Sequence, residues 1–452
     1  MTRLLLWADH KKQFLLTTLQ VYSCGVVTFK IWEPVPGSHF LMPVYELALK
    51  LRRHRLQFEH NIPNYKNYTM YFLLKRWKPC IVVAAILLIA GVAGCSSTKS
   101  LLNTGTYQTK LVAELPETYN TIDGMEMGPD NSIILSVPNF NNQYLLEKGR
   151  IKTPSPAFMA VIHKDNRVEH WYDFKPEDLH PLTGKVGPMD CAFGPDGNLY
   201  VNDRQWFYNK DHQSRILRIN VKNGKPVGAD VVVTGMMSCN GMYWKDSTLF
   251  VTESVLQKSD TALYSGVYAF PIGQLKKEQP VKVEAFSYGK GDSHLVTWFK
   301  SFNHLGSGAD GITFDDKGYL YTTVIEEGKI YRSKLDAANK AVETKLFVHD
   351  KQVIGPDGLI FSVQYQTFFL ADFLGNAVHA IDMNGKVHTL HQNGDSDGSD
   401  GSLDQPAELV LRGNELIIVN MDMAWASKGY AVNSDVDMKF NICKIDLKAV
   451  QK

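Results

Sequence analysis

The part of the chain after residue 120 repeats one pattern of apolar and polar positions. Each copy starts with a residue that is usually small, polar or acidic, has apolar residues two and four positions later, and continues through a short turn into an apolar stretch. Apolar alternation on both sides of a turn such as Gly-Pro-Asp-Gly is typical of a β-hairpin. The pattern therefore predicts six hairpins, and long helical periods are absent. The six copies are Asp123–Val137, Met189–Val201, Asn240–Val251, Asp310–Thr322, Asp357–Ala371 and Ala407–Val419.

The spacing of the copies indicates how the hairpins are arranged. Three intervals are about 50 residues and two are nearer 70 residues, whereas a four-stranded propeller blade takes about 40–50 residues. Short apolar segments between the hairpins, such as Arg215–Asn220 and Ala377–Asp382, would complete the blades. We therefore predict an all-β fold, a six-bladed β-propeller with a central channel, because a ring of blades leaves only short strand edges. A two-sheet sandwich is the alternative, but it predicts shorter and irregular intervals.

Two segments flank the repeats. Thr106–Pro116 precedes the first hairpin and Met438–Leu447 follows the last one. Either segment could supply a strand that completes the last blade and closes the ring, so we assign residues 106–452 to the propeller.

The N-terminal region carries a different signal. Cys80–Gly94 is uncharged and apolar over 15 residues, which is short of the roughly 20 residues that a spanning helix needs and fits the core of a signal peptide. Lys75, Arg76 and Lys78 precede it, and the sequence Val-Ala-Gly before Cys95 resembles a bacterial lipobox. We predict a lipoprotein signal peptide over residues 70–94, with Cys95 as the lipidated residue. A short, uncleaved transmembrane anchor is the alternative.

This interpretation determines the predicted location of the protein. A lipid on Cys95 would anchor the chain in the membrane of the cell envelope through a polar tether, residues 95–105. Ser96 resembles the sorting signal for the outer membrane, facing the periplasm or the exterior. Residues 1–69 are expected to be an over-extended reading frame or an unstructured extension, since a signal peptide belongs at the start of a chain.

The charge of the exported part excludes one class of partner. From Cys95 onward the sequence has 36 Lys and Arg residues against 43 Asp and Glu residues. Nucleic-acid binders need clustered positive charge, so we expect no nucleic acid as a partner. The cysteines that remain after Cys95 are odd in number, which predicts buried thiols and no disulfide framework; they are Cys191, Cys239 and Cys443.

Three phrases resemble a known family. The sequences Cys239-NGMYW, Ala309-DGITFDDKGYLY and Ile354-GPDGL are similar to the starts of inner strands in propellers of the senescence-marker-protein/gluconolactonase/luciferin-regenerating-enzyme family. The resemblance implies a divalent cation, usually calcium, at one mouth of the channel, held by an acid, two Asn residues and an Asp from successive blades. It implies Asp123, Asn240 and Asp310 as metal ligands here. At the second-blade position the chain has Met189 in place of Asn, and Asp190 follows it.

The residues support a cation independently of this resemblance. Inner strands of a propeller converge, so the leading residues Asp123, Asn240, Asp310 and Asp357 should face one another. Crowded carboxylates repel, and calcium takes six to eight oxygen ligands from carboxylates, amides and water. The alternative is that these Asp-Gly and Asn-Gly pairs only form turns.

The resemblance also implies the candidates for catalysis, because in the resembling lactonases an acid near the metal acts as general base. We expect Asp310 in this role, with Asp357 as the second choice. Three further residues are possible at the mouth: Asp190 if a bulge shifts its strand, His304, and Glu408 one position off the row.

An Asp-rich run, Gln392–Ser402, contains the letters of a Gly-x-Ser-x-Gly nucleophile motif. No helix follows it, so we interpret it as a solvated loop, with a surface calcium site as the alternative.

Three functions fit these observations. The first is a metal-dependent hydrolase of lactones or related esters, acting as a monomer on a small molecule. The second is a non-catalytic propeller that binds a ligand or a protein, and the third is a strictosidine-synthase-like propeller. The missing second-blade Asn favours the second function, and Asp123, Asn240 and Asp310 favour the first.

The lipobox yields a direct prediction. The mature protein should start at a lipidated Cys95, and Cys95→Ser should leave an uncleaved precursor, because the thiol is the atom that receives the lipid. Mass spectrometry of the membrane fraction measures both outcomes. An unmodified Cys95 in a chain that still begins at Met1 or Met70 would contradict the prediction.

Overall fold

The computed structural model describes two units, Met1–Ser97 and Thr98–Lys452. In the first unit it describes the backbone of four strands. In the second it describes residue 102 and residues 105–448, apart from residues 211, 288–290, 425–429, 434 and 438. The apolar core of the predicted signal peptide and Cys95 lie outside the described residues, as does most of the tether.

The four strands of the first unit form one antiparallel sheet in the order β1-β2-β3-β4. Their bounds are β1 Thr2–Asp9, β2 Phe14–Val21, β3 Val26–Trp32 and β4 Tyr68–Leu73. The assignment of residues 1–69 to an extension and of residues 70–94 to a signal peptide remains a prediction.

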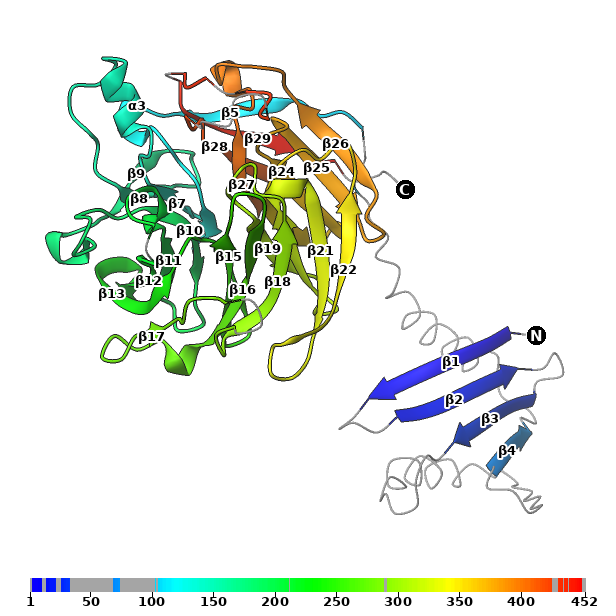
Figure 1. Cartoon of the computed structure of the whole chain (residues 1–452). Coiled ribbons are helices and arrows are strands. Elements are labelled where there is room, and N and C mark those ends of the chain that lie inside the picture. The colour runs from blue at the N-terminus through cyan, green and yellow to red at the C-terminus, as the bar shows by residue number, and fades with distance from the viewer. Residues whose placement is uncertain are drawn as a thin grey trace. The chain divides into compact units, whose positions relative to one another are not determined.

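The second unit is a six-bladed β-propeller, which confirms the predicted fold (Figure 1). The first blade is β6 Met125–Met127, β7 Ile133–Val137, β8 Phe158–Ile162 and β9 Val168–Asp173. The second blade is β10 Pro188–Phe193, β11 Leu199–Asp203, β12 Ser214–Lys222 and β13 Lys225–Met236, with β17 Val281–Lys282 at its edge. The third blade is β14 Cys239–Lys245, β15 Thr248–Lys258, β16 Leu263–Pro271 and β18 Leu295–Ser301.

The remaining blades repeat this order. The fourth blade is β19 Ala309–Phe314, β20 Leu320–Val324, β21 Lys329–Leu335 and β22 Ala341–His349. The fifth blade is β23 Pro356–Ser362, β24 Thr367–Asp372, β25 Ala377–Asp382 and β26 Val387–Gln392. The sixth blade is β27 Pro406–Arg412, β28 Glu415–Asn420, β29 Asn441–Asp446 and β5 Thr109–Glu114.

Helical structure in the described part of the propeller is limited to short connections. They are α3 Asn142–Glu147, η1 Glu117–Tyr119, η2 Pro176–Asp178, η3 Gln205–Phe207, η4 Ile272–Gln274, η5 Ile325–Glu327 and η6 Ser399–Gly401. No helix among the described residues is long and apolar enough to cross a membrane.

The two flanking segments together close the ring. Strand β5, which comes before the first blade, pairs antiparallel with β29 at the end of the chain, and Asn441 lies opposite Glu114. In Figure 1 the cyan strand β5 lies beside the red strand β29. The sixth blade is thus built from both ends of the propeller, so separating the ends of the domain would open the ring.

The inner strands approach one another so closely that four of them have no room for a side chain at the residue that follows the leading residue of the repeat. We call this residue the second position. A Cβ atom on Gly124, Gly241, Gly311 or Gly358 would lie less than 3.0 Å from backbone atoms of the next blade's inner strand. None of these four glycines has a positive φ. The Asp-Gly and Asn-Gly pairs are therefore explained by close backbone approach, and not by the turn conformation that was the alternative interpretation.

A buried acceptor near the end of the second strand of each blade fixes the loop that leads into the inner strand. In the third blade, Glu253 accepts hydrogen bonds from the backbone N–H groups of Met237 and Ser238. Such bonds satisfy backbone donors that would otherwise be buried without a partner. The acceptors in blades one to six are Asn139, Asp203, Glu253, Glu326, Asp372 and Asn420. The loops at the mouth of the channel are consequently held by side chains from the framework of each blade.

The faces of the blades pack through apolar side chains. Tyr200 and Trp244 meet edge to face across blades two and three, and Phe250 meets Phe314 across blades three and four. The predicted buried thiols are confirmed, because Cys191, Cys239 and Cys443 are free and buried.

Candidate functional site

A cavity opens at one mouth of the channel, where the inner strands begin. Its empty volume is about 550 Å³, including the part that is open to solvent. The leading residues Asp123, Met189, Asn240, Asp310 and Asp357 all line it. The predicted row is thus brought together for five of the six blades, whereas Ala407 of the sixth blade is buried and does not line the cavity.

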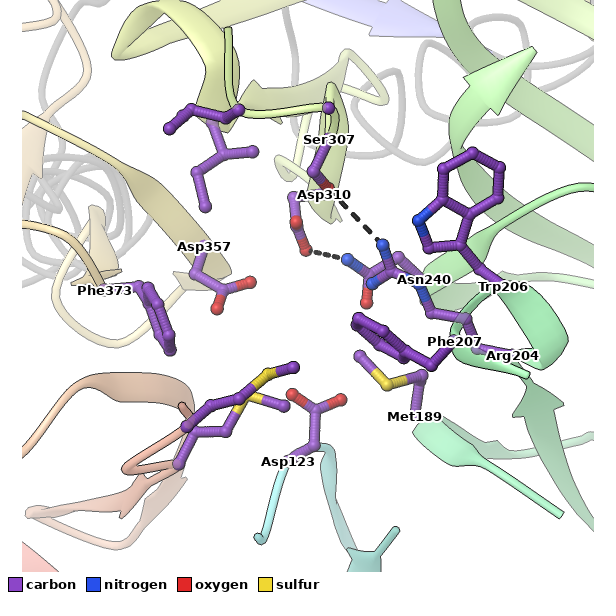
Figure 2. Close-up of a pocket in the computed structure, with 15 residues that line it drawn as sticks. Asp123, Met189, Arg204, Trp206, Phe207, Asn240, Ser307, Asp310, Asp357 and Phe373 are labelled. Carbon is purple, nitrogen blue, oxygen red and sulfur yellow. Dashed lines mark hydrogen bonds between the residues drawn. The ribbon is translucent and has the colours of Figure 1, made fainter. Parts of the chain in front are cut away.

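Three carboxyl groups point toward the same space (Figure 2). Asp123 approaches from the first blade, Asp310 from β19 and Asp357 from β23. Asn240 donates a hydrogen bond from Nδ2 to Oδ1 of Asp310 at 2.6 Å. The carboxyl groups of Asp310 and Asp357 lie close enough for each to change the pKa of the other, as they do when Asp357 carries a proton toward Asp310.

Burial and mutual repulsion change the acidity of these groups. Burial, together with the charge of Asp310, raises the pKa of Asp123 to about 7. Burial raises the pKa of Asp310 to about 6, although its hydrogen bond with Asp357, the Arg204 charge and Asn240 act in the opposite direction. Burial and the neighbouring Asp310 raise the pKa of Asp357 well above its usual value. Asp357 therefore holds the proton of the pair and Asp310 is the group that ionises first.

Asp190 and Glu408 belong to a second layer below this row. The bulge that could have turned Asp190 toward the mouth is present in β10. However, Oδ2 of Asp190 accepts a hydrogen bond from Met242 N at 2.6 Å, and Oδ1 accepts one from Cys191 N at 2.8 Å. Glu408 accepts one from Leu409 N at 2.8 Å. Neither carboxyl group lines the cavity.

Asp190 in the second blade and Glu408 in the sixth blade occupy the second position of the repeat, where the other four blades have glycine. Burial raises the pKa of both carboxyl groups well above the usual range, and the charge of Asp190 raises the pKa of Glu408 further. The second layer thus consists of acids that tend to keep their protons, and it contributes no cavity wall.

His304 lies behind the mouth and not in it. Its Nδ1 is 3.1 Å from Oε1 of Glu326, and its ring centroid is 5.3 Å from that of Tyr430. Glu326 accepts hydrogen bonds from the backbone N–H groups of residues 304–307. The next residues of this loop, Leu305, Gly306 and Ser307, line the cavity. Glu326 therefore holds this part of the cavity wall in place.

Arg204 is the site residue that the sequence did not reveal. Its side chain is buried at the cavity, and Nη2 donates to Oγ of Ser307 at 3.5 Å. Its Nε has no hydrogen-bond partner among the described residues. The guanidinium charge lowers the pKa of both Asp123 and Asp310. The signal in the sequence was an arginine directly after the hairpin of the second blade, next to the aromatic run Trp206–Tyr208.

The oxygen atoms of the row fit a hard divalent cation only in part. Asp123, Asn240 and Asp310 offer carboxylate and amide oxygens, which calcium prefers. Met189 places a soft thioether where a further oxygen ligand is expected, and Arg204 already brings one positive charge. In the part of the chain that the structure describes, no group of three or more His, Cys, Asp and Glu side chains is arranged to hold a metal ion.

The chain is similar to known proteins only distantly. No family model matches the chain, and no curated protein sequence matches it. Among solved structures, a gluconolactonase from Xanthomonas campestris shows 12% identity and a TM-score of 0.46, covering 77% of this chain and 92% of that one. The calcium-binding protein regucalcin from Agrobacterium tumefaciens shows 11% identity and a TM-score of 0.45, covering 77% and 96%.

A third similar structure has a different activity. The PQQ-bound aldose sugar dehydrogenase from Streptomyces coelicolor shows 12% identity and a TM-score of 0.47, covering 77% of this chain and all of that one. These likenesses concern the fold alone.

The raised pKa values predict how stability depends on pH without divalent cations. An unfolded Asp releases its proton near 3.8, whereas folded Asp123 keeps it up to about 7. The folded state then binds more protons than the unfolded state, so the free energy of unfolding should fall as pH rises from about 4 to 7. Asp123→Asn should make this slope shallower by up to about 1.4 kcal/mol per pH unit.

Urea denaturation in metal-free buffer between pH 4 and pH 7 measures this slope. Asp246→Asn, a change at an exposed hairpin turn, is the matched control. Equal slopes in wild type and Asp123→Asn would show that Asp123 ionises freely in the folded protein.

Proposed function

We propose that the propeller is a hydrolase of lactones or related esters, with its reaction centre at the mouth of the channel. The observation that supports this most is the convergence of Asp123, Asp310 and Asp357 on one cavity beside Asn240 (Figure 2). Buried carboxyl groups with separated pKa values are typical of acid–base catalysis. Asp310 and Asp357 form such a pair.

A divalent cation, with calcium as the best candidate, would be held by Asp123, Asn240 and Asp310. When bound, it would polarise a substrate carbonyl as a Lewis acid. Asp310 has two carboxylate oxygens, so it can offer one to the cation and keep the other for a proton.

The proton chemistry depends on residues of this chain. The ionised Asp310 accepts a proton from a water molecule as the water oxygen forms a bond to the carbonyl carbon. Arg204 stabilises the negative charge that develops on the carbonyl oxygen. The ring C–O bond then breaks, and the leaving oxygen takes the proton from Asp310, which gives the hydroxy acid. Asp357 donates its hydrogen bond to Asp310 and keeps that carboxylate oriented.

Apolar side chains in the lining of the cavity favour an apolar substituent on the substrate. They are the uncharged aromatic and thioether side chains of Trp206, Phe207, Phe373, Met421 and Met423. Methionine adapts its shape to irregular ligands, and aromatic rings offer large contact areas. A lactone with a hydrocarbon substituent suits this lining better than a free sugar lactone with many hydroxyl groups.

A non-catalytic ligand-binding propeller is the second candidate. Met189 at the second-blade position removes one oxygen ligand, and Arg204 supplies a fixed positive charge near Asp123 and Asp310. In that case a carboxylate or another anionic group of the ligand would pair with Arg204, and no bond would break.

The proposed setting is the cell envelope. The lipobox before Cys95 supports a membrane-anchored propeller that meets small molecules outside the cytoplasm, in the periplasm or at the exterior.

Kinetics on a panel of lactones and aryl esters test the proposal. Wild type should hydrolyse lactones with apolar substituents, and chelation should abolish the activity. Asp310→Asn should lower kcat/KM by at least about 100-fold, because removal of a general base costs roughly that much. Asp357→Asn should lower kcat while leaving calcium affinity nearly unchanged.

Asp246→Asn is the matched control and should keep wild-type activity. If wild type binds a lactone or its hydroxy acid without turning it over, the second candidate is correct. Activity that survives in Asp310→Asn would contradict the assigned role of Asp310.

A further inference from the structure

A second group of buried oxygen atoms lies outside the cavity, where two loops of the sixth-blade region meet. One loop joins β26 to β27 and contains Asp404, and the other joins β28 to β29 and contains Asp422 and Asn433. Each of the three residues is at most 1% exposed, and none lines the cavity. The proposed hydrolysis does not use them.

Hydrogen bonds bring the three side chains together across the two loops. Asn433 donates from Nδ2 to Oδ1 of Asp404 and to the backbone oxygen of Ser396. The backbone N–H of Asp422 donates to the backbone oxygen of Asp404 at 3.3 Å. Oδ2 of Asp422 accepts a hydrogen bond from Asp437 N at 3.0 Å.

One oxygen of each side chain is left without a partner. Oδ2 of Asp404, Oδ1 of Asp422 and Oδ1 of Asn433 are buried and accept no hydrogen bond from the described residues. A buried acceptor without a donor costs about 1–3 kcal/mol, and more if it is charged. Because these three residues are joined by the hydrogen bonds described above, their unpartnered atoms indicate that a group that bonds to oxygen completes the folded chain there.

The acidic groups around these oxygens show which kind of group fits. Asp395, Asp397 and Asp437 lie close enough to Asp404 to act on its charge. Asp404 acts on Asp422 in the same way, and Arg150 is the opposing charge there. Unpartnered carboxyl and amide oxygens among several acids suit a cation, because a cation bonds to the oxygens and also balances the acids when they ionise.

We infer that Asp404, Asp422 and Asn433 hold a divalent cation of the calcium class through these three oxygen atoms. Two carboxylates and one amide are hard oxygen donors, and calcium fills the rest of its shell with backbone oxygens and water. The Asp-rich run Gln392–Ser402 forms part of the surrounding loop. Its Ser396 hydroxyl donates to the backbone oxygen of Leu403 and is not placed as a nucleophile.

The cation would act on the wall of the cavity. Asp422 lies between Met421 and Met423, which both line the cavity. A cation that ties Asp422 to Asp404 fixes the β28–β29 loop against the β26–β27 loop. Its ligands come from other strands and loops than Asp310, so cation binding at this site can be measured separately from the reaction.

Equilibrium dialysis of calcium against the full chain, freed of metal beforehand, tests the inference. Asp404→Asn and Asp422→Asn should each bind one calcium ion fewer per chain than wild type, or bind it at least about tenfold more weakly. Asp400→Asn, an exposed acid in the same loop, should bind as wild type does. Asp310→Asn should retain this site, so a loss at the channel is distinguishable from a loss here.

Tryptic cleavage after Lys439 gives a second measurement that does not depend on variants that fold poorly. Lys439 is exposed and Phe440 is buried, so cleavage requires this end of the loop to open. Calcium should slow the cleavage in wild type and in Asp310→Asn, and should have no effect in Asp422→Asn. Unchanged stoichiometry and affinity in both cluster variants would overturn the inference, as would a wild-type protein whose cleavage after Lys439 does not respond to calcium.

Discussion

The repulsion among acids at the axis is the constraint on which the rest of this propeller depends. Six inner strands converge so closely that four of them require glycine at the second position. The same convergence brings Asp123, Asp310 and Asp357 into one cavity, with a single guanidinium from Arg204 among its lining residues. Burial is the main cause of the raised pKa values of all three groups, and neighbouring acids raise the pKa of Asp123 and Asp357 further, so their ionised forms are unfavourable at the mouth. A proton, an arginine or a divalent cation can compensate the negative charge of these carboxyl groups, and the chemistry of the site depends on which of the three does so.

Other buried carboxylates of the propeller, outside the cavity, accept hydrogen bonds from the backbone. Asp372 accepts hydrogen bonds from Ile354 N and Gly355 N, and Glu326 accepts them from the backbone of residues 304–307. These carboxylates are satisfied by backbone donors, so they are fixed parts of the framework. The acids at the cavity differ because they face other carboxyl groups and accept no such set of backbone hydrogen bonds from the described residues. The distinction separates structural carboxylates from the candidate catalytic ones in a fold that buries both.

The sequence was sufficient to predict the six-bladed ring, but it predicted only part of the candidate site. Apolar alternation and turn residues predicted six hairpins, because these patterns are local and repeat at the length of a blade. The row of Asp123, Asn240, Asp310 and Asp357 followed from the position of each residue within its hairpin. Asp190 lies one position further along its strand, and there the side chain faces the neighbouring blade and bonds to Met242 N.

Contacts between loops that are distant in the sequence could not be predicted from the repeat of apolar and polar positions. Arg204 follows a hairpin and reaches the mouth only because the η3 turn directs it there. Asp404 and Asn433 are separated by most of the sixth blade, and they meet because β27 and β28 return the chain to the same end. Neither contact is indicated by the periodicity of the sequence.

The central claim is that a cation relieves the repulsion at the mouth. A crystal of the protein grown with calcium, with diffraction recorded where calcium scatters anomalously, tests it directly. The account predicts an anomalous peak within about 2.3–2.6 Å of oxygens of Asp123, Asn240 and Asp310. A mouth without such a peak, in which Arg204 alone faces the carboxylates, would contradict it.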